Sequence, residues 1–413
     1  MSVSSSSHRS SLLTDKGCVV IDIGHTYTKV GMSGEPAPRF IIRSKTRLKL
    51  SGKTVNVLDK ELLWSPQKLA KVMTSFMKDI FLNYLLTNPK DSRVIIVESL
   101  VNPMAIRNAL AHALFKQLNV SYVVFMPSHL LCTFAIGRQS ALVVDVGYKE
   151  TEILPIYEGI PVVNAWQVIP FAAEEVQSCV KQMITEKCEV TVDPDDIRPA
   201  STLQDEVIDA ELENIIVKTC FVRSQDNDQA PSSIQYPFYS ENFLLSLDGT
   251  IRSHSADVMF NPDDLSVQQA ILESVLRCPR DCRKELCENL LIVGGGAMIP
   301  GFNYRLKQEL FSLLEDKDLK YHSKLSISSF KFHSPPGQIN CTQWLGGSIF
   351  GMLETAVLER AVTRERYADS GRLPDWLSPE PSLREELHAV KRGSSTPTMA
   401  RHSAATRTKP PVQ

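Results

Sequence analysis

The sequence predicts an α/β protein built from two related halves, and two observations carry that prediction. Short apolar runs alternate with amphipathic helical stretches along most of the chain, which is the pattern of strands joined by helical crossovers. An apolar strand that ends in Asp-x-Gly, followed by a polar turn and a second strand, also occurs twice, at residues 19–32 and 142–155. The two aspartates, Asp22 and Asp145, are 123 residues apart, so each half contains one copy of the hairpin.

The elements between the two hairpins follow from local signals. Ser65 and Pro66 are typical of a helix start, and Asn88-Pro89 is typical of its end. Further helices are expected from Pro103 toward residue 118 and up to Gly137, and strands at residues 93–99, 122–126 and 141–147. This succession of strand, helix, strand, helix and strand predicts a parallel sheet with crossover connections.

Length, composition and charge exclude several classes of protein. The 413 residues are 43% hydrophobic and 22% charged, ordinary values for a soluble globular protein of roughly two to four domains. Lys and Arg number 45 against 47 Asp and Glu, a net charge of −2. A near-neutral chain has no global electrostatic reason to bind nucleic acid or a membrane surface.

Cysteine usage and the termini indicate a cytosolic protein. The nine cysteines have no framework spacing, which favours a reducing compartment. The N-terminal residues lack the apolar stretch of a secretory signal, and no apolar run reaches membrane-spanning length. We therefore expect neither direct membrane insertion nor nucleic-acid binding.

Five parts make up the expected domain organisation. Ser-rich residues 1–16 are expected to form a disordered arm. Residues 380–413, which end in a basic stretch rich in Pro, Ser and Thr, are expected to form a disordered tail that cannot bury enough apolar surface to fold. The first half, the second half and a C-terminal segment are placed between them, at residues 17–140, 141–333 and 334–379. Residues 223–240 are polar and are expected to form a loop.

The duplicated hairpin contains residue types that suit a phosphate-bound metal ion. The carboxylates of Asp22 and Asp145 can hold a hydrated Mg²⁺, and Gly24 and Gly147 let backbone N–H groups approach phosphate oxygens. Lys29, seven residues after Asp22, is spaced to reach those phosphates from the return strand. Two facing hairpins would clamp a nucleotide between the halves. The alternative is that each Asp-x-Gly is an ordinary hairpin turn.

A glycine-rich turn after a third apolar strand is a weaker signal. Residues 290–302 contain that strand, then Gly294, Gly295 and Gly296, and then a helix. Such a turn allows a ligand to approach a positive helix N-terminus, but tight packing of the turn also explains the glycines.

The cysteine cluster and one histidine have plainer interpretations than a metal or catalytic site. Cys278, Cys282 and Cys287 lack the spacing of a zinc site, so thiols on the surface or in the core of a helical region are expected. His129 lies in an apolar stretch and is interpreted as a core histidine.

Four segments resemble actin and the actin-related proteins, in the same order along the chain. They are IDIGHTYTKVGMSGEPAPR, LPIYEGIPV, GGGAMIPG and SPPGQINCTQWLGGSIF, at residues 21–39, 154–162, 294–301 and 334–350. The resemblance covers residues 18–376. It implies an actin-like fold, of the kind shared with Hsp70 and sugar kinases, in which two related halves surround a nucleotide cleft and the C-terminal segment returns to the first half.

The resemblance also implies ATP or ADP with Mg²⁺ as the cofactor. The metal residues would be Asp22 and Asp145. The residues that bind the nucleotide would be those two aspartates together with Gly24, Lys29, Gly147, Gly294 and Gly295.

Departures from the family pattern argue against catalysis. The family's glutamine that positions the attacking water falls at Ser128, and the histidine that assists it falls at Glu152. Because water activation needs an oriented polar pair, we expect no catalytic residue and no efficient hydrolysis. Further departures lie in the phosphate loops and at the ribose and base contacts: His25, Tyr148, Lys149, Glu150, Glu213, Ile216, Val217 and Ile299.

A shortened segment indicates the position of the chain in an assembly. Residues 39–65 are too few for the pointed-end lobe that this segment builds in actin, so nothing could add behind the subunit. The divergent loops and the ending at residues 367–376 are similar to the actin-related subunit at the pointed end of dynactin. The resemblance therefore implies a cytoplasmic, cytoskeletal cap whose partners are the actin-related filament subunits of dynactin, the dynactin pointed-end subunits and, indirectly, dynein.

Two other functions remain open at this stage. One is an enzyme of the same fold, either an ATPase or a sugar kinase, for which Glu152 is the candidate carboxylate base. The other is a nuclear chromatin-remodelling actin relative, whose members have larger insertions. The strings PIYEG and WLGGSI favour an actin relative over sugar kinases and chaperone ATPases.

Overall fold

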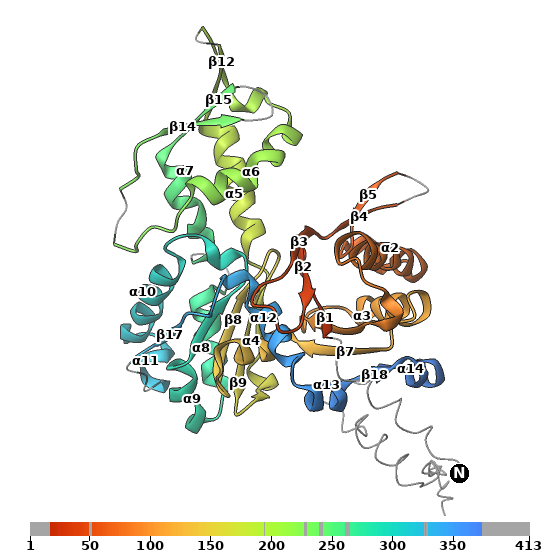
Figure 1. Ribbon diagram of the computed structural model, residues 1–413. Coiled ribbons are helices and arrows are strands. Elements are labelled where there is room, and N and C mark those ends of the chain that lie inside the picture. Colours follow the sequence, from red (N-terminus) through yellow and green to blue (C-terminus); the bar gives the residue numbers. More distant parts are fainter. Residues whose placement is uncertain are drawn as a thin grey trace, which may run out of the picture.

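The computed structural model describes residues 17–373, except 49–51, 194, 227–228, 239–242, 261–264, 326 and 328. The expected arm, the expected tail and residues 374–379 lie outside the described residues. The described part is a mixed α/β structure with two bodies that meet at a central junction (Figure 1).

The first body contains the N-terminal elements. They are β1 (Cys18–Ile23), β2 (Tyr27–Met32), β3 (Phe40–Arg43), β4 (Lys45–Arg47), β5 (Thr54–Asn56), α1 (Lys60–Leu63), α2 (Pro66–Asp79), β6 (Arg93–Glu98), α3 (Met104–Ala111), β7 (Tyr122–Pro127) and α4 (Ser128–Ile136). The C-terminal elements α12 (Thr342–Phe350), α13 (Glu354–Arg360), β18 (Val362–Thr363) and α14 (Arg364–Ser370) return to it.

The second body contains the elements between them. Its sheets and connections are β8 (Ala141–Val146), β9 (Thr151–Tyr157), β10 (Ile160–Pro161), β11 (Gln167–Ile169), α5 (Ala173–Lys187), β12 (Glu189–Asp193), β13 (Asp196–Pro199), α6 (Asp205–Thr219), β14 (Ile234–Phe238), β15 (Phe243–Leu247), α7 (Gly249–His254), α8 (Val267–Arg277), α9 (Arg280–Cys287), β16 (Leu290–Val293), α10 (Phe302–Glu315), α11 (Lys320–Lys324) and β17 (Phe332–His333).

The sheet of the first body has the strand order β18-β7-β6-β1-β2-β3. β1 pairs in parallel with β6, and β6 with β7, whereas β1 and β2 form an antiparallel hairpin. Successive side chains of a strand point to opposite faces. Val19 and Ile21 accordingly pack toward α2 and α3, and Val20 packs toward Trp344 of α12. Both faces are covered, which explains the continuous apolar run of β1.

Two expectations from the sequence differed for the strand at residues 141–147. The succession of strands and helices favoured one parallel sheet with the two strands before it, whereas the repeat assigned it to the second half, and β8 lies in the second body. There it pairs in parallel with β16 and antiparallel with β9, in the order β10-β9-β8-β16-β17. The chain changes body after α4, and alternation of strands and helices alone contains no signal for such a crossing.

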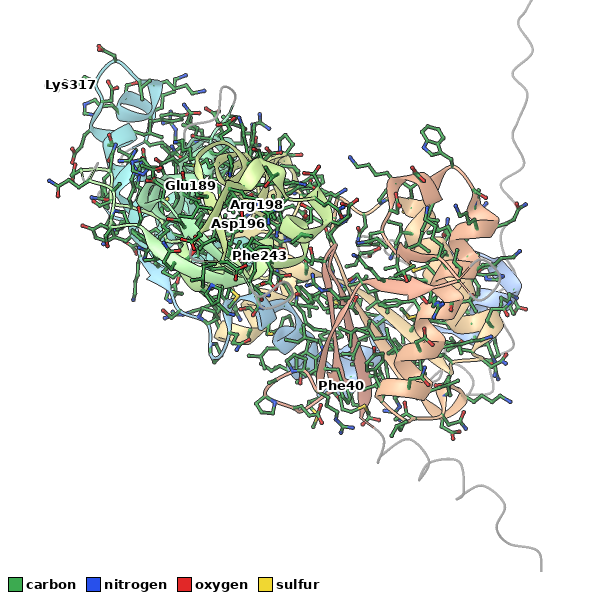
Figure 2. The ribbon with its side chains drawn as sticks, turned by 90° about the horizontal axis from the view of Figure 1, so that it is seen from above. Phe40, Glu189, Asp196, Arg198, Phe243 and Lys317 are labelled. Atoms are coloured by element: carbon green, nitrogen blue, oxygen red, sulfur yellow. The ribbon has the colours of Figure 1, made fainter. Side chains whose placement is uncertain are left out.

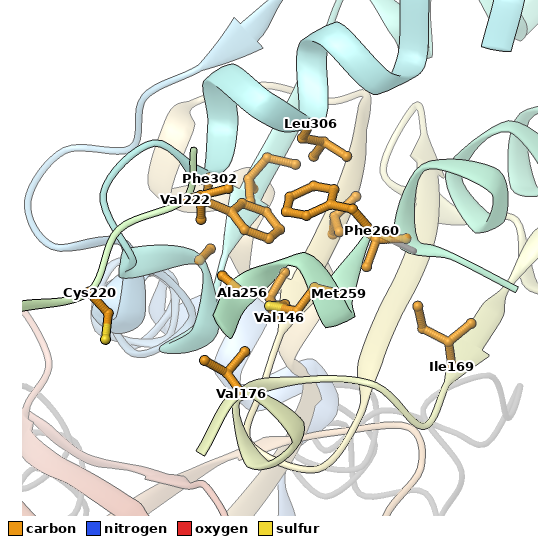
Figure 3. Packing of buried hydrophobic residues seen from close by; sticks show 14 of the residues in the cluster. Val146, Ile169, Val176, Cys220, Val222, Ala256, Met259, Phe260, Phe302 and Leu306 are labelled. Atoms are coloured by element: carbon orange, nitrogen blue, oxygen red, sulfur yellow. The ribbon is translucent and has the colours of Figure 1, made fainter. Parts of the chain in front are cut away.

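The largest core lies on one face of this second sheet. Val146 of β8 and Ile169 of β11 pack with Phe260, Phe302 and Leu306 from the surrounding helices and turns (Figure 3). The cysteines of the cluster at residues 278–287 are buried in the same core, as one of the two interpretations from the sequence expected.

A separate four-stranded antiparallel sheet, in the order β13-β12-β15-β14, extends from the second body beside α5, α6 and α7 (Figure 1). The loop expected at residues 223–240 is therefore wrong in its last part, because β14 pairs with β15. Tyr236 and Phe238 are buried, whereas Gln235 and Pro237 are exposed. Pro237 obscured this alternation in the sequence, and an edge strand such as β14 tolerates a proline.

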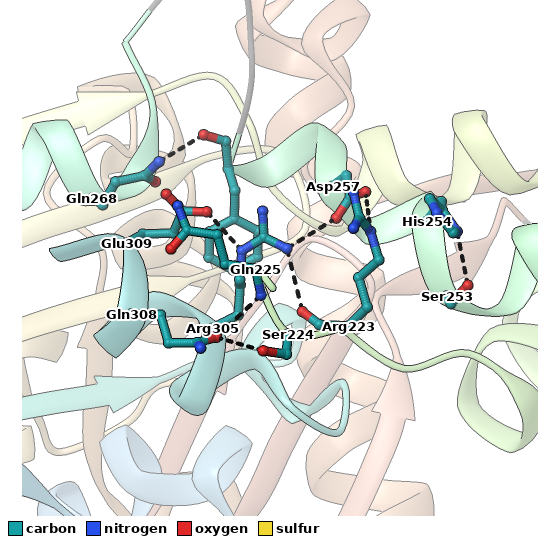
Figure 4. A network of polar contacts seen from close by, with 11 residues as sticks. Arg223, Ser224, Gln225, Ser253, His254, Asp257, Gln268, Arg305, Gln308 and Glu309 are labelled. Atoms are coloured by element: carbon teal, nitrogen blue, oxygen red, sulfur yellow. Dashed lines mark hydrogen bonds and ion pairs between the residues drawn. The ribbon is translucent and has the colours of Figure 1, made fainter. Parts of the chain in front are cut away.

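The first part of that expected loop is fixed by a buried ion-pair network (Figure 4). Arg305 of α10 contacts Glu309 at 2.6 Å and Asp257 at 3.5 Å, and Arg223 donates to Asp257 at 2.8 Å. The side chain of Arg305 is only 3% exposed. Removing one of its partners would leave a buried charge uncompensated, at a cost of roughly 3–5 kcal/mol, so the segment around Arg223 is firmly held to α10.

The predicted helices are present, but two of them end in wider turns. α2 begins at Pro66 as expected, although Ser65 makes no side-chain cap, and it continues into a π-helical turn at Ile80–Tyr84. α3 continues into a second π-helical turn at His112–Gln117. Within the described ranges, no helix is both long and apolar enough to cross a membrane.

α12 and α4 cross closely at the junction of the two bodies. A side chain at Gly346 would collide with the backbone of Leu131 in α4, so glycine is needed for this approach. The neighbouring residues of α12 contact both bodies. Trp344 donates its indole N–H to the carbonyl oxygen of Val20 at 3.1 Å, and Gln343 donates to Asp145 at 2.8 Å.

Candidate functional site

The two hairpins of the internal repeat close with the same backbone hydrogen bond. Gly24 N–H donates to the carbonyl oxygen of Tyr27 at 3.0 Å, and Gly147 N–H donates to that of Glu150 at 3.1 Å. A Cβ atom would lie 2.8 Å from the Tyr27 oxygen at Gly24 and 2.9 Å from the Glu150 oxygen at Gly147. Both turns therefore require glycine, which accounts for the repeated Asp-x-Gly in physical terms.

Asp22 and Lys29 form a cross-strand ion pair in the first hairpin. They are direct partners in the β1–β2 register, and Lys29 Nζ lies 2.8 Å from Asp22 Oδ2. Burial alone would lower the pKa of Lys29, but the charge and hydrogen bond of Asp22, with a further contribution from Asp145, hold it above its ordinary value. The lysine is therefore charged and lies within the electrostatic reach of both aspartates.

The second hairpin has a different pair at the same positions. Asp145 and Glu152 are direct partners in the β8–β9 register, and burial raises the pKa of each carboxyl. Glu152 is 4% exposed, and its Oε1 accepts a hydrogen bond from Ser99 Oγ at 2.5 Å. Its Oε2 has no hydrogen-bond partner among the described residues.

Ser128 and His129 lie at the base of the same cluster. Ser128 is buried, and its Oγ lies 3.2 Å from His129 Nδ1. His129 Nε2 lies 3.5 Å from the carbonyl oxygen of Glu152. The interpretation of His129 as a buried histidine is confirmed by its 1% exposure. Its ring also contacts two polar residues of the site, Ser128 and Glu152. Its electrostatic effect opposes that of burial and lowers the pKa of Asp145 and of Glu152.

The glycine-rich turn after β16 lies against the second hairpin. Val293 is the register partner of Asp145. Gly294 has φ +95°, and a side chain there would collide with the Val146 backbone and the Asp145 carboxylate, so this residue must be glycine. A Cβ atom added at Gly295 would have no neighbouring atom within 4 Å, so packing does not explain the glycine at this position.

The tips of the two hairpins touch across the junction. The rings of His25 and Tyr148 are stacked, with centroids 5.6 Å apart and planes inclined by 3°. The Tyr148 hydroxyl donates to Gln177 at 3.0 Å. Burial, followed by the positive charge of Lys149, lowers the pKa of His25 to about 4, so the imidazole is neutral at physiological pH.

A second contact between the bodies lies farther out. Glu213 of α6 accepts a hydrogen bond from the Tyr27 hydroxyl at 2.6 Å and an ion-paired one from Arg43 at 2.6 Å. The Arg43 guanidinium also lies 4.5 Å from the centre of the Tyr27 ring. We call these three residues the clasp, because they connect β2 and β3 of the first body to α6 of the second.

The residues between the hairpins fit the phosphate and metal end of a nucleotide. Asp22, Asp145 and Lys29 are close enough to influence one another electrostatically. Gln343 Oε1 and Glu152 Oε2 are buried acceptors without a partner in the described part of the chain, and the water molecules of a hydrated Mg²⁺ would satisfy them. No three His, Cys, Asp or Glu side chains converge on a metal position within the described residues.

The residues aligned with the ribose and base contacts of the family provide few polar groups for a nucleoside. Glu213 is engaged in the clasp. Ile216 is buried, and Val217 is 73% exposed. None of the three supplies a free charged group to a sugar hydroxyl.

Sequence reasoning missed the residues that make contacts across the site. Ser99, Gln343, Tyr27 and Arg43 were not singled out, because each acts through a partner far away in the chain. For Arg43 the only signal was the run of basic residues between positions 39 and 53. Gln343 lies within the recognised segment at residues 334–350, but nothing there indicated its bond to Asp145.

Two comparisons with known proteins agree with this geometry. Residues 14–374 match the family model described as "Actin". "Actin-related protein 10" of Dictyostelium discoideum is 29% identical over 430 residues, an alignment that covers 88% of this chain and 90% of that protein.

Proposed function

The chain belongs to the actin family, and we propose that it caps the pointed end of the actin-related filament of dynactin. The observation that supports this proposal most is the reduced segment at residues 39–65, whose described residues form three short strands, β3 to β5, and the one-turn helix α1. Subunits joined head to tail grow without limit unless one of them lacks a face. A subunit with a reduced pointed-end face would stop growth. The similarity to actin-related protein 10 supports this assignment.

The proposal includes a bound nucleotide with a structural role. ATP or ADP would be held through its phosphates, with Mg²⁺ near Asp22 and Asp145, and the metal would neutralise phosphate charge between the two bodies. Lys29 would contact the phosphates, and the chain would close on them at Gly24, Gly147, Gly294 and Gly295. The tight turns at Gly24, Gly147 and Gly294 support this arrangement.

Hydrolysis is not part of the proposal. Ser128 is a short buried side chain that lies against His129, and Glu152 adds a carboxyl group where the family has a histidine. The family's glutamine and histidine, which orient and activate the attacking water molecule, are thus both replaced. Steady phosphate release by the purified protein, abolished in Asp145→Asn, would instead favour an ATPase.

The proposed organisation follows the two bodies, with the first half at residues 17–140, the second at 141–333 and a C-terminal segment at 334–379. The protein would act in the cytoplasm, on the cytoskeleton, and would hold the non-actin pointed-end subunits of dynactin. Through them it would support dynein-driven movement along microtubules.

Electron microscopy of dynactin that carries a tagged copy of this chain tests the capping role directly. One tag per filament, at the pointed end, is expected. The pure protein should also remain in the supernatant when it is centrifuged under conditions that sediment actin filaments. Tags along the whole filament, or sedimentation of the pure protein, would overturn the proposal.

A further inference from the structure

A basic surface with one exposed tryptophan lies on the reduced lobe and the helix beside it. Trp64 is 90% exposed. The residues from 39 to 79 include ten Lys or Arg and three Asp or Glu, in a chain whose net charge is −2. The rest of the molecule is therefore acidic, and the positive charge is concentrated in this region.

Ion pairs within the molecule neutralise part of this positive charge. Arg39 pairs with Glu35 at 2.6 Å, and Arg43 is engaged in the clasp. The lysines of α1 and α2 differ, because Lys60, Lys68, Lys71 and Lys78 are exposed and form no ion pair with any described residue. The available positive charge thus includes these four lysines of α1 and α2, together with the exposed Lys45 of β4.

These lysines and the tryptophan lie on two helices that contact each other, α1 and α2. Lys60 and Trp64 are four residues apart, and Trp64 retains helical backbone angles at the end of α1, so their side chains share one face. Lys68, Lys71 and Lys78 follow on one stripe of α2, at spacings of three and seven residues. The hairpin of β4 and β5 packs beside α2, where Thr46 lies 3.2 Å from Ser75 (Figure 1). We call Lys60, Trp64, Lys68, Lys71 and Lys78 the basic tryptophan face.

We propose that the basic tryptophan face binds an acidic segment of a non-actin protein subunit, with the indole of Trp64 inserted into an apolar recess of that partner. This proposal rests on the capping function and specifies the chemistry of the pointed-end partner. An indole is a large apolar group that water solvates poorly, and tryptophan is enriched among the residues that dominate binding energy. Four unpaired lysines around it favour carboxylates on the partner and speed the encounter.

An acidic protein explains the surface better than a membrane or a nucleic acid does. Both of those are extended polyanions, and the acidic remainder of the molecule would oppose their approach. A protein segment can place its carboxylates opposite the four lysines alone. The single aromatic side chain also suits a recess in a protein better than a bilayer, which usually receives several apolar side chains of one helix face.

The test uses dynactin assembled with variants of the full chain. The charge variant carries Lys60→Glu, Lys68→Glu and Lys71→Glu, and a second variant carries Trp64→Ala. A matched control carries Lys284→Glu, Lys307→Glu and Lys317→Glu, which change the net charge equally at exposed positions elsewhere. We measure two quantities, the amount of this chain on the actin-related filament and the amount of non-actin pointed-end subunits that co-purify with it.

Both face variants should remain on the filament and lose the pointed-end subunits, by about tenfold or more for Trp64→Ala. The control should retain them. Pointed-end subunits retained by both face variants would overturn the proposal. Absence of the unmodified chain from the filament would instead refute the capping function, so the two failures are distinguishable.

A photo-crosslinking amino acid at position 64 identifies the contact independently in purified dynactin. The expected product joins this chain to an acidic segment of a non-actin subunit. Crosslinking to an actin-related subunit alone would contradict the proposal. Binding of the unmodified protein, but not the charge variant, to phosphatidylserine vesicles or to RNA in place of that crosslink would assign the face to a membrane or a nucleic acid.

Discussion

Glu152 lies directly opposite Asp145 on the neighbouring strand, at the position where the first hairpin has Lys29 opposite Asp22. The duplicated unit thus has an ion pair in one copy and two carboxyl groups in the other. Like charges directly opposite one another destabilise a strand pair, by roughly 0.2–1 kcal/mol. The second hairpin tolerates them because Ser99, Gln343 and His129 surround the pair.

Removing the negative charge of Glu152 should therefore stabilise the protein. Glu152→Gln keeps the size of the side chain and its hydrogen bond from Ser99, and it relieves the like-charge contact with Asp145. We expect the free energy of unfolding at pH 7.5 to rise by roughly 1 kcal/mol. Urea denaturation measures the change, with Glu285→Gln on the exposed face of α9 as the control. A loss of stability would show that the carboxylate itself is needed, for example to hold a cation.

The stack of His25 on Tyr148 should make the junction sensitive to acid. Burial, followed by the charges of Lys149 and Lys60, lowers the pKa of His25 to about 4, and the charge of Asp59 opposes this shift. An unfolded histidine titrates near pH 6.5, so the unfolded state binds the proton more readily between these values. The stability from this group is complete above about pH 7 and is lost as the pH falls toward 4.

His25→Phe keeps a ring against Tyr148 without a titrating group. Between pH 7 and pH 5, the free energy of unfolding should fall less in this variant than in the unmodified protein. Tyr148→Ala should lower stability at both pH values, because it removes the stacking partner. Equal acid sensitivity in His25→Phe and the unmodified protein would mean that other groups control the acid response.

The clasp should slow the exit of a bound nucleotide more than it stabilises the fold. Arg43 and Glu213 are 53% and 33% exposed, so solvent screens their ion pair and a double-mutant cycle should give only about 0.5 kcal/mol. Opening of the bodies, however, must break these contacts before a nucleotide can leave. Release of a fluorescent ATP analogue should be several-fold faster in Arg43→Met and in Glu213→Gln.

Arg198 provides a matched control for the clasp. It pairs with Asp196 at the same distance of 2.6 Å, on β13, away from the junction (Figure 2). Arg198→Met should leave the release rate unchanged. If the clasp variants and this control release the analogue at the same rate, the clasp does not restrain the bodies.

Asp145→Asn should lower nucleotide content and thermal stability together. The amide still accepts the hydrogen bond from Gln343 but no longer attracts a cation. A ligand present at about one hundred times its Kd stabilises a protein by about 2.7 kcal/mol, and that amount should be lost. Chromatography of the denatured protein measures the nucleotide, and Asp196→Asn is the control. Nucleotide-free unmodified protein from its native source would refute the proposed site.

Local signals in the sequence were sufficient for most of the fold. The strands of the first body and the turn at Gly137 follow from apolar runs and a left-handed residue, and these depend only on neighbours in the chain. β14 was missed because Pro237 obscured its alternation. Alternation of strands and helices favoured one sheet for β8 and the strands before it, and only the repeat assigned β8 to the second half, because pairing partners are not encoded locally.

The same limit applies to the candidate site. Asp22, Lys29 and Asp145 could be named from the repeat, because a hairpin brings residues seven apart together. The link from Ser99 to Glu152, the bond from Gln343 to Asp145 and the clasp join residues 53 to 198 positions apart. A single sequence contains no periodicity over such separations, so only the folded chain reveals them.

The adjacent contacts of Gln343 and Trp344 have a consequence for the way the molecule melts. One turn of α12 is bonded to Asp145 in one body and to Val20 in the other, and Gly346 brings α12 into close contact with the backbone of α4 at Leu131. Unfolding of either body must therefore break the contacts that this turn of α12 makes with the other body. Heating should therefore melt both bodies in one cooperative transition, with equal calorimetric and van't Hoff enthalpies, although each has its own sheet and its own core.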